Sequence, residues 1–250
     1  MRMDRILANS GCGTRTEVKK WIRSGFVSVG GQIITDPSAE IPESNLNDVS
    51  VSGQKVRCSH FLYLCLNKPD RCLTALEDTR LRTVREFIPV HLLGKGIAPV
   101  GRLDYHTTGV LLFTNDGELN HRLSSPKHHI PKSYTVRFSG PPIDPETVSL
   151  IASGMVLRDR PGKKEILSPA TIGSDGPSGC QITIYEGKTH QVKRMLAATG
   201  RSVISLHRHD FAGIRLTSDQ KFGQIRDLTE EEIDALKNAC GFNDRSEKLI

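Results

Sequence analysis

The residues best placed for chemistry lie in one polar loop of this sequence. Segment 101–109 contains Asp104, and the apolar runs 97–100 and 110–113 flank it. A carboxylate held at the rim of a core loses hydration, so it needs a cationic partner to stay ionised. On spacing alone, the simpler interpretation is an Asp that caps a turn or pairs with Arg102.

A second group of polar side chains lies at 186–195, which reads Glu-Gly-Lys-Thr-His-Gln-Val-Lys-Arg-Met. We expect a helix over 188–199 whose apolar residues form a packing face, with Lys193 and Arg194 pointing elsewhere. An exposed basic face is the alternative for both cations. Tyr134 alternates with apolar residues on a predicted strand, so it fits either a core position or a flat platform for a ligand.

Motifs for nucleotide triphosphate, dinucleotide, zinc-protease and lipase chemistry are absent from the sequence. The close pairs His128-His129 and His207-x-His209 have no Cys or acidic neighbour at ligand spacing. Their basic neighbours, which indicate contact with an anion, are Lys127, Lys132 and Arg208. The sequence therefore predicts no metal site and no cofactor.

The elements that position these residues alternate irregularly after residue 60. Strands are predicted near 61–67, 97–101, 109–115, 133–139, 180–186, 202–209 and 213–217. Helices are predicted near 83–88, 117–124, 144–154 and 188–199. This mixture favours an α+β fold over a regular β-α-β parallel sheet.

The first 31 residues form a separate basic segment, with six bases against two acids. Thr14-x-x-Glu17 predicts a capping box that starts a helix. Phe26–Val29, Gly30-Gly31 and Gln32–Ile34 predict a hairpin with a two-residue glycine turn. Segment 36–47 is rich in turn residues, and 49–56 predicts another hairpin. Such a density of charge suggests phosphate contact, with a solvated helix face as the alternative.

The net charge of the 250 residues is +6, which excludes an acidic solvating protein. From Arg226 to Ile250 seven acids face four bases, a local charge of −3, so residues 1–225 carry +9. Three of these acids are Glu230, Glu231 and Glu232. Together with Thr229 before them they form a second capping box, at the start of a predicted terminal helix. The basic character therefore belongs to the body of the protein.

The apolar runs are far shorter than the roughly 20 residues of a membrane span. No apolar stretch follows the charged residues Arg2, Asp4 and Arg5, so we expect no secretory signal and a cytoplasmic protein. The six Cys contain no C-x-x-C pair and are expected to be free thiols. Nothing in the sequence demands more than a monomer.

The N-terminal pattern resembles the S4 RNA-binding domain. The residues that carry this resemblance are Arg2-x-Asp4-x-x-Leu7, Thr14-Arg15, Val18, Ile22 and Gly25-x-Val27-x-Val29-Gly30-Gly31. The resemblance implies binding of structured RNA through the basic face of a helix pair. It places phosphate contacts at Arg2, Arg15, Lys19, Lys20 and Arg23.

Three dispersed motifs resemble those of RNA pseudouridine synthases that carry an S4 domain. They are the run Gly101-Arg102-Leu103-Asp104-x-x-Thr107-Thr108-Gly109, the tyrosine segment Lys132-Ser133-Tyr134-x-Val136 and the basic run 186–195. The resemblance implies a small S4-like RNA-binding domain at 1–59, a catalytic domain at 60–240 on a mixed, mainly antiparallel sheet, and a tail at 241–250. One departure is Asp70-Arg71 after Asn67-Lys68-Pro69, where the family usually has a Gly, so the loop there is expected to take another backbone path.

The resemblance also implies a reaction, in which a uridine within RNA is isomerised to pseudouridine without a cofactor. Asp104 would act on the nucleotide as nucleophile or base, Lys193 would be its counter-charge, and Tyr134 would stack on the target uracil. Further RNA contacts are expected at Arg102, His106, Lys127, His128, His129, Arg194 and Arg208.

The implied partner is ribosomal RNA in small-subunit precursor particles. The target would be 16S rRNA, at a site of the uridine 516 type. The alternatives are a synthase acting on 23S rRNA or tRNA, and a non-catalytic RNA-binding assembly factor.

Overall fold

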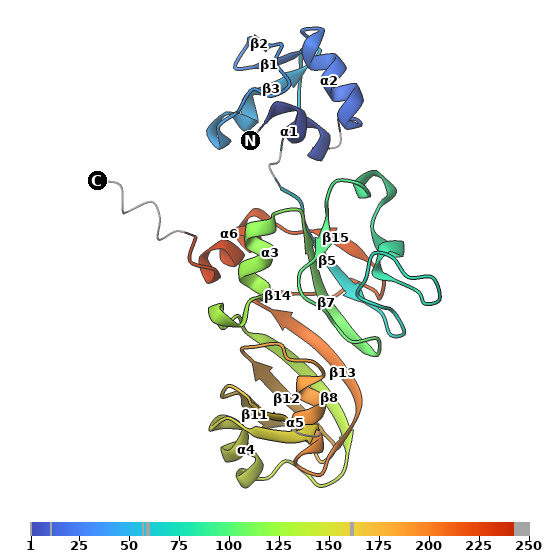
Figure 1. Cartoon of the computed structure of the whole chain (residues 1–250), viewed down its shortest axis with the longest axis vertical. Helices are drawn as coiled ribbons and strands as arrows, with labels where there is room; N and C mark the ends of the chain where they lie inside the picture. The colour runs from blue at the N-terminus through green and yellow to red at the C-terminus, as the bar shows by residue number, and fades with distance from the viewer. Residues whose placement is uncertain (1, 11, 57, 59–60, 161–162, 243–250) are drawn as a thin grey trace, which may run out of the picture. The chain divides into compact units, whose positions relative to one another are not determined.

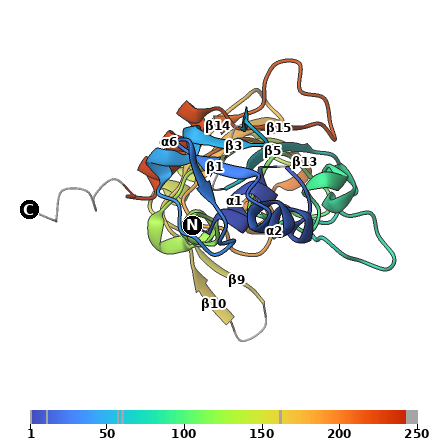
Figure 2. The same ribbon diagram turned by 90° about the horizontal axis from the view of Figure 1, so that it is seen from above.

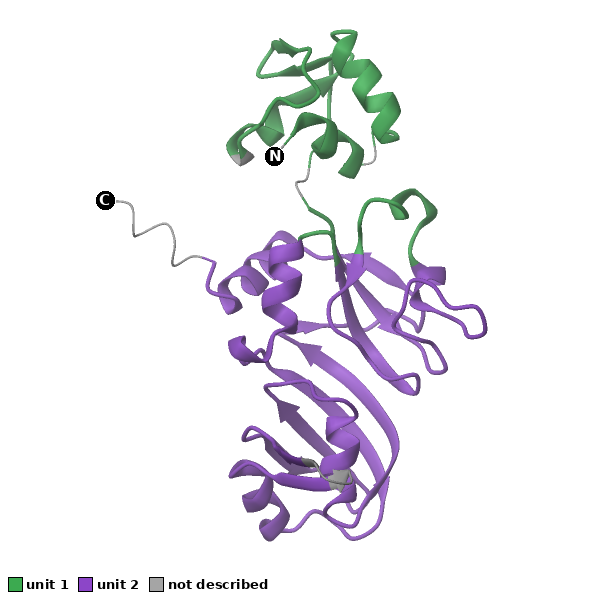
Figure 3. Cartoon of the chain, viewed as in Figure 1, with its two compact units in different colours: residues 1–62, 88–97, 114–116 green, residues 63–87, 98–113, 117–250 purple. Residues whose placement is uncertain are grey.

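The computed structural model describes residues 2–10, 12–56, 58, 61–160 and 163–242. The chain divides into two compact units, which Figure 3 colours separately. The first comprises residues 1–62, 88–97 and 114–116, and the second comprises residues 63–87, 98–113 and 117–250. The predicted boundary at 59–60 and most of the predicted tail at 241–250 lie outside the described residues, and both stay predictions.

The first unit contains two α-helices and a four-stranded antiparallel sheet; Figure 1 labels both helices and the strands β1, β2 and β3. The helices are α1 (Met3–Asn9) and α2 (Arg15–Arg23). The sheet has the order β2-β1-β3-β4, formed by β2 (Gln32–Ile34), β1 (Val27–Val29), β3 (Val49–Val51) and β4 (Gln54–Lys55). A 3-10 helix, η1 (Glu43–Asp48), lies in the predicted turn-rich segment. One core joins these elements and includes Met3, Ile6, Val18, Ile22 and Val49.

The capping box and the two-residue glycine turn predicted for the first unit are both present. Thr14 accepts a hydrogen bond from the backbone N–H of Glu17, whose side chain accepts one from the N–H of Thr14, so the capping box is present. Val29 pairs with Gln32 across Gly30 and Gly31, which have φ values of 56° and 82°. Two consecutive positive φ values define a type I′ turn, which glycine adopts without strain.

The second unit is built on a mixed sheet with the order β11-β12-β8-β13-β7-β5-β15. In addition, β14 pairs with β13, and β6 pairs with β7. The strands are β5 (Tyr63–Lys68), β6 (Ala98–Pro99), β7 (Thr107–Thr114), β8 (Lys132–Ser139), β11 (Thr171–Ser174), β12 (Gly179–Ile184), β13 (Ser202–Phe211), β14 (Ile214–Arg215) and β15 (Ile225–Asp227). Strands β13 and β7 are parallel, whereas β11–β12, β12–β8, β8–β13, β13–β14 and β5–β15 are antiparallel. The predicted α+β fold on a mainly antiparallel sheet is therefore confirmed.

Four α-helices belong to the second unit. They are α3 (Gly117–Ser124), α4 (Pro145–Ala152), α5 (Gln191–Ala197) and α6 (Glu230–Ala239). Helix α5 packs on β13, and α4 packs on β11. The predicted capping box of the terminal helix is present between Thr229 and Glu232. Across the described residues, no helix is both long and apolar enough to cross a membrane.

The structure differs from the predicted elements at several places. Segment 84–87 is a 3-10 helix, η2 (Val84–Phe87), because Pro89 disfavours helical geometry at the residue before it. Two further 3-10 helices are η3 (Val90–Leu92) and η4 (Pro126–His128). Strands β9 (Val156–Arg160) and β10 (Lys163–Ile166) form a hairpin that stands away from the main sheet in Figure 2. The sequence did not predict these two strands, β11 or β15, since charged residues or short length obscure their alternation.

Candidate active site

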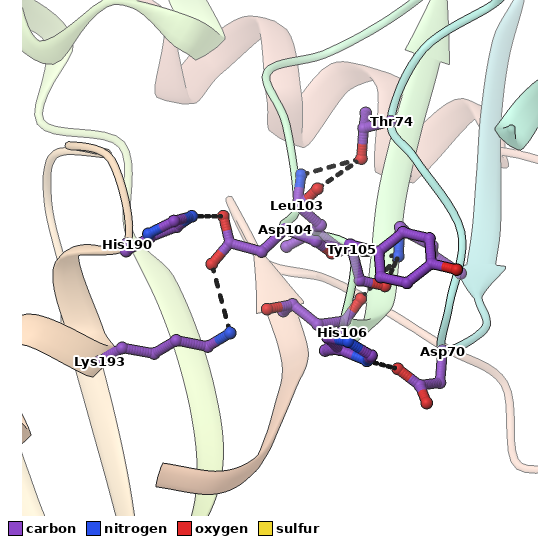
Figure 4. Close-up of polar contacts among 10 residues, drawn as sticks. Asp70, Thr74, Leu103, Asp104, Tyr105, His106, His190 and Lys193 are labelled. Carbon is purple, nitrogen blue, oxygen red and sulfur yellow. Dashed lines mark hydrogen bonds and ion pairs between the residues drawn. The ribbon is translucent and has the colours of Figure 1, made fainter. Parts of the chain in front are cut away.

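Asp104 lies in the loop between β6 and β7, and the backbone around it is fixed on two sides (Figure 4). Thr74 Oγ1 accepts a hydrogen bond from the N–H of Leu103 at 3.1 Å and donates to its carbonyl oxygen at 2.7 Å. The N–H of Thr107 donates to the carbonyl oxygen of Asp104 at 3.0 Å. The carboxylate is therefore presented from a loop with a defined backbone path, and its side chain is 30% exposed.

Lys68, at the end of β5, holds the same loop from beneath. Its buried ammonium donates hydrogen bonds to the carbonyl oxygens of Pro69, Asp104, Tyr105 and Thr107, at 3.1, 3.2, 3.4 and 2.9 Å. Burial lowers the pKa of Lys68 to about 8. This lysine is a positioning residue, because it contacts the backbone of the Asp104 loop and not the carboxylate.

The side chains of Lys193 and His190 face the carboxylate of Asp104. The Nζ atom of Lys193 lies 3.7 Å from Oδ2, and Nε2 of His190 lies 3.6 Å from Oδ1 (Figure 4). Lys193 is on α5, and His190 immediately precedes that helix. The structure thus brings together the predicted pair of Asp104 and Lys193, and it adds a histidine.

The start of α5 explains why these two residues project toward Asp104. His190 has a φ of 52°, a left-handed conformation that stops the helix from extending backward to residue 188. The side chain of Gln191 accepts from the N–H of Lys188 at 2.9 Å and donates to Glu186 at 3.0 Å. The predicted helix at 188–199 is therefore shorter, and its first turn forms one wall of the site.

A cavity of about 110 Å³ opens beside Asp104. Tyr134 lies in its wall with 7% of its surface exposed, so it is both well packed and in contact with the cavity. Other residues of the wall are Ile184, Val192, Leu206, Arg208 and Phe211. Charged and polar side chains also line the cavity, among them Arg102, Asp104, Thr107, Lys132, Lys188 and His190. Such a mixed lining suits a flat, partly polar ligand.

Arg208 is placed differently from a surface RNA contact. Its side chain is buried, at 2% exposed, and its Nε donates to the carbonyl oxygen of Val110 at 2.8 Å. Its guanidinium lies 4.6 Å from the ring centre of Phe211. Lys132, buried on β8, also lines the cavity, and burial and the nearby Arg208 lower the pKa of Lys132 to about 8.

Of the remaining predicted RNA contacts of this unit, Arg102 lines the same cavity as Asp104, whereas His106, Lys127, His128 and His129 are not part of its lining. Arg102, His106, Lys127, His128 and His129 are exposed. Nδ1 of His106 lies 2.9 Å from Asp70 Oδ1, which stabilises the ionised acid. The pKa of that carboxyl is lowered overall, because hydrogen bonds from His106 and the Arg71 N–H together outweigh the larger single effect of desolvation.

Arg194 joins α5 to the β9–β10 hairpin. Its Nη2 lies 2.6 Å from Glu165 Oε2, and its side chain is 10% exposed. Arg194 is thus placed as a link between two elements of the protein, and its predicted contact with RNA stays a prediction.

In the first unit, the predicted phosphate contacts surround a buried acid. Asp4 is fully buried, and its Oδ2 lies 3.1, 3.6 and 3.8 Å from Arg2, Arg15 and Lys19. Lys20 and Arg23 are exposed on α2. A single carboxylate therefore organises three of the five cations.

The loop after Pro69 shows what the departure from the family pattern does. Arg71 has a φ of 53°, in the left-handed region that a glycine adopts without strain. Arg71 thus adopts a backbone conformation that suits the glycine usual at this place in the family. The presence of Arg71 therefore does not by itself require another backbone path.

Several residues of the site were not singled out from the sequence. His190 and Lys68 stood inside segments already noted, and Lys132 was predicted only as an anion contact, because the roles of all three depend on burial and distance. Thr74 carried no signal beyond its position, and Asp4 appeared only as part of the S4 pattern. Among the described residues, no group of three or more His, Cys, Asp or Glu side chains gathers as a metal site would require.

Comparisons with known proteins identify the family of the chain. The family model described as RNA pseudouridylate synthase matches residues 62–198, and the S4 domain model matches residues 1–45. The chain is 38% identical over 240 residues to "Uncharacterized RNA pseudouridine synthase YtzG" of Bacillus subtilis (strain 168), covering 94% of this chain and 98% of that protein. It is 37% identical over 235 residues to "Ribosomal small subunit pseudouridine synthase A" of Escherichia coli (strain K12), covering 93% and 98%. A crystal structure of a pseudouridylate synthase aligns with a TM-score of 0.65 and 34% identity, covering 94% of this chain and 99% of that one.

Proposed function

Because this chain belongs to the RNA pseudouridine synthase family, we propose that it isomerises one uridine of the small-subunit ribosomal RNA to pseudouridine. The observation that carries the proposal is Asp104, held at the mouth of a cavity with Lys193 at its carboxylate and Tyr134 in the cavity wall. The reaction breaks the C1′–N1 bond and forms a C1′–C5 bond, with one proton moving from C5 to N1. No electrons are gained or lost overall, so the isomerisation needs no redox partner.

Each residue of the cluster has a role in this proposal. The Asp104 carboxylate acts on the target nucleotide, either as the nucleophile or as the base that removes a ribose proton. Lys193 places a positive charge 3.7 Å from that carboxylate and so balances its negative charge. Tyr134 offers its ring to the flipped uracil, which offsets the stacking lost from the RNA.

The S4 domain supplies the RNA anchor in this proposal. Exposed cations on α2 and around Asp4 contact phosphates, which adds affinity without selecting a base. Selection of the uridine then depends on the RNA structure that both units contact together.

The proposed target is supported by the relatives. Proteins of Escherichia coli and Haemophilus influenzae named ribosomal small subunit pseudouridine synthase A match over 93% and 94% of this chain. We therefore assign the target to 16S rRNA, at a site of the uridine 516 type, modified in a precursor particle of the small subunit. In this proposal the enzyme acts as a monomer in the cytoplasm.

Tritium release tests the assignment. Small subunits, their precursors, large subunits, tRNA and free rRNAs, each labelled with tritium at uridine C5, are incubated with the protein, and released label and the position of pseudouridine are measured. We expect release from 16S rRNA, with Asp104→Asn as the inactive control. Release only from 23S rRNA or tRNA would overturn the target, and tight binding with no release from any RNA would favour a non-catalytic assembly factor.

A further inference from the structure

Two cations are buried at the cavity without a negative partner. Lys132 and Arg208 are 8% and 2% exposed and both line the cavity. Within the part of the chain that the structure describes, no carboxylate oxygen lies within 4.0 Å of either side chain. The nearby Glu186 is engaged elsewhere, with Gln191 and Lys188. Buried charges are normally paired, so this arrangement leaves an excess of positive charge in the site.

The hydrogen-bonding capacity of both side chains is only partly used. Lys132 donates one bond, to the carbonyl oxygen of Ile130 at 2.9 Å, although an ammonium has three N–H groups. Arg208 uses Nε on Val110, and its buried Nη2 has no partner among the described residues. Unsatisfied buried donors are rare in native proteins and require an explanation.

The ring of Phe211 makes the burial of two neighbouring cations tolerable. Lys132 Nζ lies 5.3 Å and the Arg208 guanidinium 4.6 Å from its centre, distances at which an aromatic face attracts a cation. This attraction is weaker than a carboxylate partner would provide. Burial and then Arg208 lower the pKa of Lys132 to about 8, and the attraction of Glu186 offsets this lowering only in part.

The sheet places both cations on the face that carries Tyr134. Lys132 and Tyr134 are two residues apart on β8, so their side chains share one face. Arg208 is the Cα partner of Tyr134 in the β8–β13 pairing, and Phe211 is the partner of Lys132. A base stacked on Tyr134 would therefore have both cations beside it.

We propose that Lys132 and Arg208 are catalytic residues that stabilise the negative charge of the uracil base when it is detached from the ribose. The inference rests on the proposed function, because heterolysis of C1′–N1 leaves the bonding electron pair on the uracil. C1′ then either bonds to Asp104 or is relieved by loss of the C2′ proton. The anion spreads over N1, O2 and O4. When C5 bonds to C1′, either the C1′–O bond to Asp104 breaks and frees the carboxylate, or the proton that Asp104 removed returns to C2′. The C5 proton then passes to N1, which quenches the anion.

The occupant of this site is the base and not a phosphate. Apart from the cations, the neighbouring walls are Tyr134, Ile184, Val192, Leu206 and Phe211, which suit a flat ring. Preorganised donors at a site of developing charge act strongly when water is excluded. The two cations are free of carboxylates in the resting site, so they are available when the base becomes anionic.

Variants that remove or retain the charge test the proposal. Lys132→Met is compared with Lys132→Arg and with Lys221→Met, an exposed lysine of the same unit as the matched control. Single-turnover rates and RNA affinity are measured separately, on whichever RNA the tritium assay identifies, so an error in the assigned rRNA does not affect the comparison. We expect Lys132→Met to lose about 10²-fold in rate with little change in affinity, Lys132→Arg to recover most of it, and Lys221→Met to match the wild type.

A modified substrate separates a charge effect from a folding defect. Fluorine at C5 itself stabilises the uracil anion. The rate at which intact 5-fluorouridine disappears from the RNA is therefore measured, and Lys132→Met should lower this rate less than it lowers the rate on uridine. Thermal melting confirms that the variants are folded. Equal impairment on both substrates, equal rates of Lys132→Met and Lys132→Arg, or a wild-type rate in Lys132→Met would each overturn the proposal.

Discussion

The ammonium of Lys193 lies 3.7 Å from Oδ2 of Asp104, although the two residues come from different elements of the second unit. His190 Nε2 lies 3.6 Å from the other carboxylate oxygen. Both oxygens of Asp104 therefore face the first turn of α5, and the carboxylate is held with its charge balanced from that side. If the activity depends on this arrangement, as we propose, two predictions follow.

Asp104→Asn should abolish isomerisation while leaving RNA affinity nearly intact. The amide has almost the same shape, but it can neither attack the nucleotide nor remove a proton. Tritium release from uridine C5 measures the activity, and a filter-binding titration measures affinity. Turnover equal to that of the wild type would rule out Asp104 as the reacting group.

Lys193→Met should lower the single-turnover rate by about 10- to 100-fold, because the Asp104 carboxylate then loses its nearest lysine. His190→Gln should cost less, since the amide can still donate a hydrogen bond toward the carboxylate while Lys193 keeps its charge beside it. The rate is compared with the RNA dissociation constant for both variants. A larger loss in His190→Gln than in Lys193→Met would assign the main counter-charge to the histidine.

The resemblance to family motifs predicted that Asp104 and Lys193 lie together, because these motifs occur in a fixed order along the chain. Composition and periodicity predicted the helices, the capping boxes and most strands of the sheet. Burial of Lys132 and Arg208 was not predictable in the same way. A basic residue on a strand is expected to face water, and only the register of β8 against β13 shows that these two face the cavity.

Gly109→Ala should strongly destabilise the second unit. A Cβ at this position would lie 2.1 Å from the carbonyl oxygen of Arg208, and the φ of Gly109 is 103°. Relief of such a clash requires strands β7 and β13 to separate, so we expect a loss of about 3–5 kcal/mol in unfolding free energy. Urea unfolding measures it.

The matched control for this clash is Gly213→Ala. Gly213 also has a positive φ, of 86°, but no atom lies within 4 Å of an added Cβ. It should cost only about 1–2 kcal/mol, which is the strain of the left-handed conformation alone. Equal losses in the two variants would show that the contact with Arg208 does not matter.

The stability difference between the wild type and Lys132→Met should depend on pH. Lys132 has a pKa of about 8 in the folded protein and 10.5 as the ordinary value, so between these pH values the unfolded chain binds more protons. The unfolding free energy of the wild type therefore rises across this window relative to the variant, by about 3 kcal/mol.

The comparison with Lys132→Met is needed because other groups titrate in the same pH range. Burial raises the pKa values of Cys58, Cys65 and Cys180 to about 11, which makes stability fall above about pH 9 in both proteins. Subtraction removes this contribution and that of Lys68. A difference that stays constant from pH 7 to pH 10 would mean that Lys132 is not desolvated.

Asp4→Asn should weaken RNA binding even though it makes the S4 domain more basic. Simple Coulomb attraction predicts tighter binding when a negative charge is removed. However, Asp4 holds Arg2, Arg15 and Lys19 together, so its loss should disperse the cations that we propose as phosphate contacts. We expect an affinity loss of about 3- to 10-fold. The log–log slope of affinity against salt, roughly −3 to −5 in the wild type, should decrease in magnitude by about one.

Asp48→Asn makes the same charge change at an exposed position of the same unit and should not weaken binding. Tighter binding by Asp4→Asn in a folded protein would show that the carboxylate only opposes RNA, with no part in arranging its contacts.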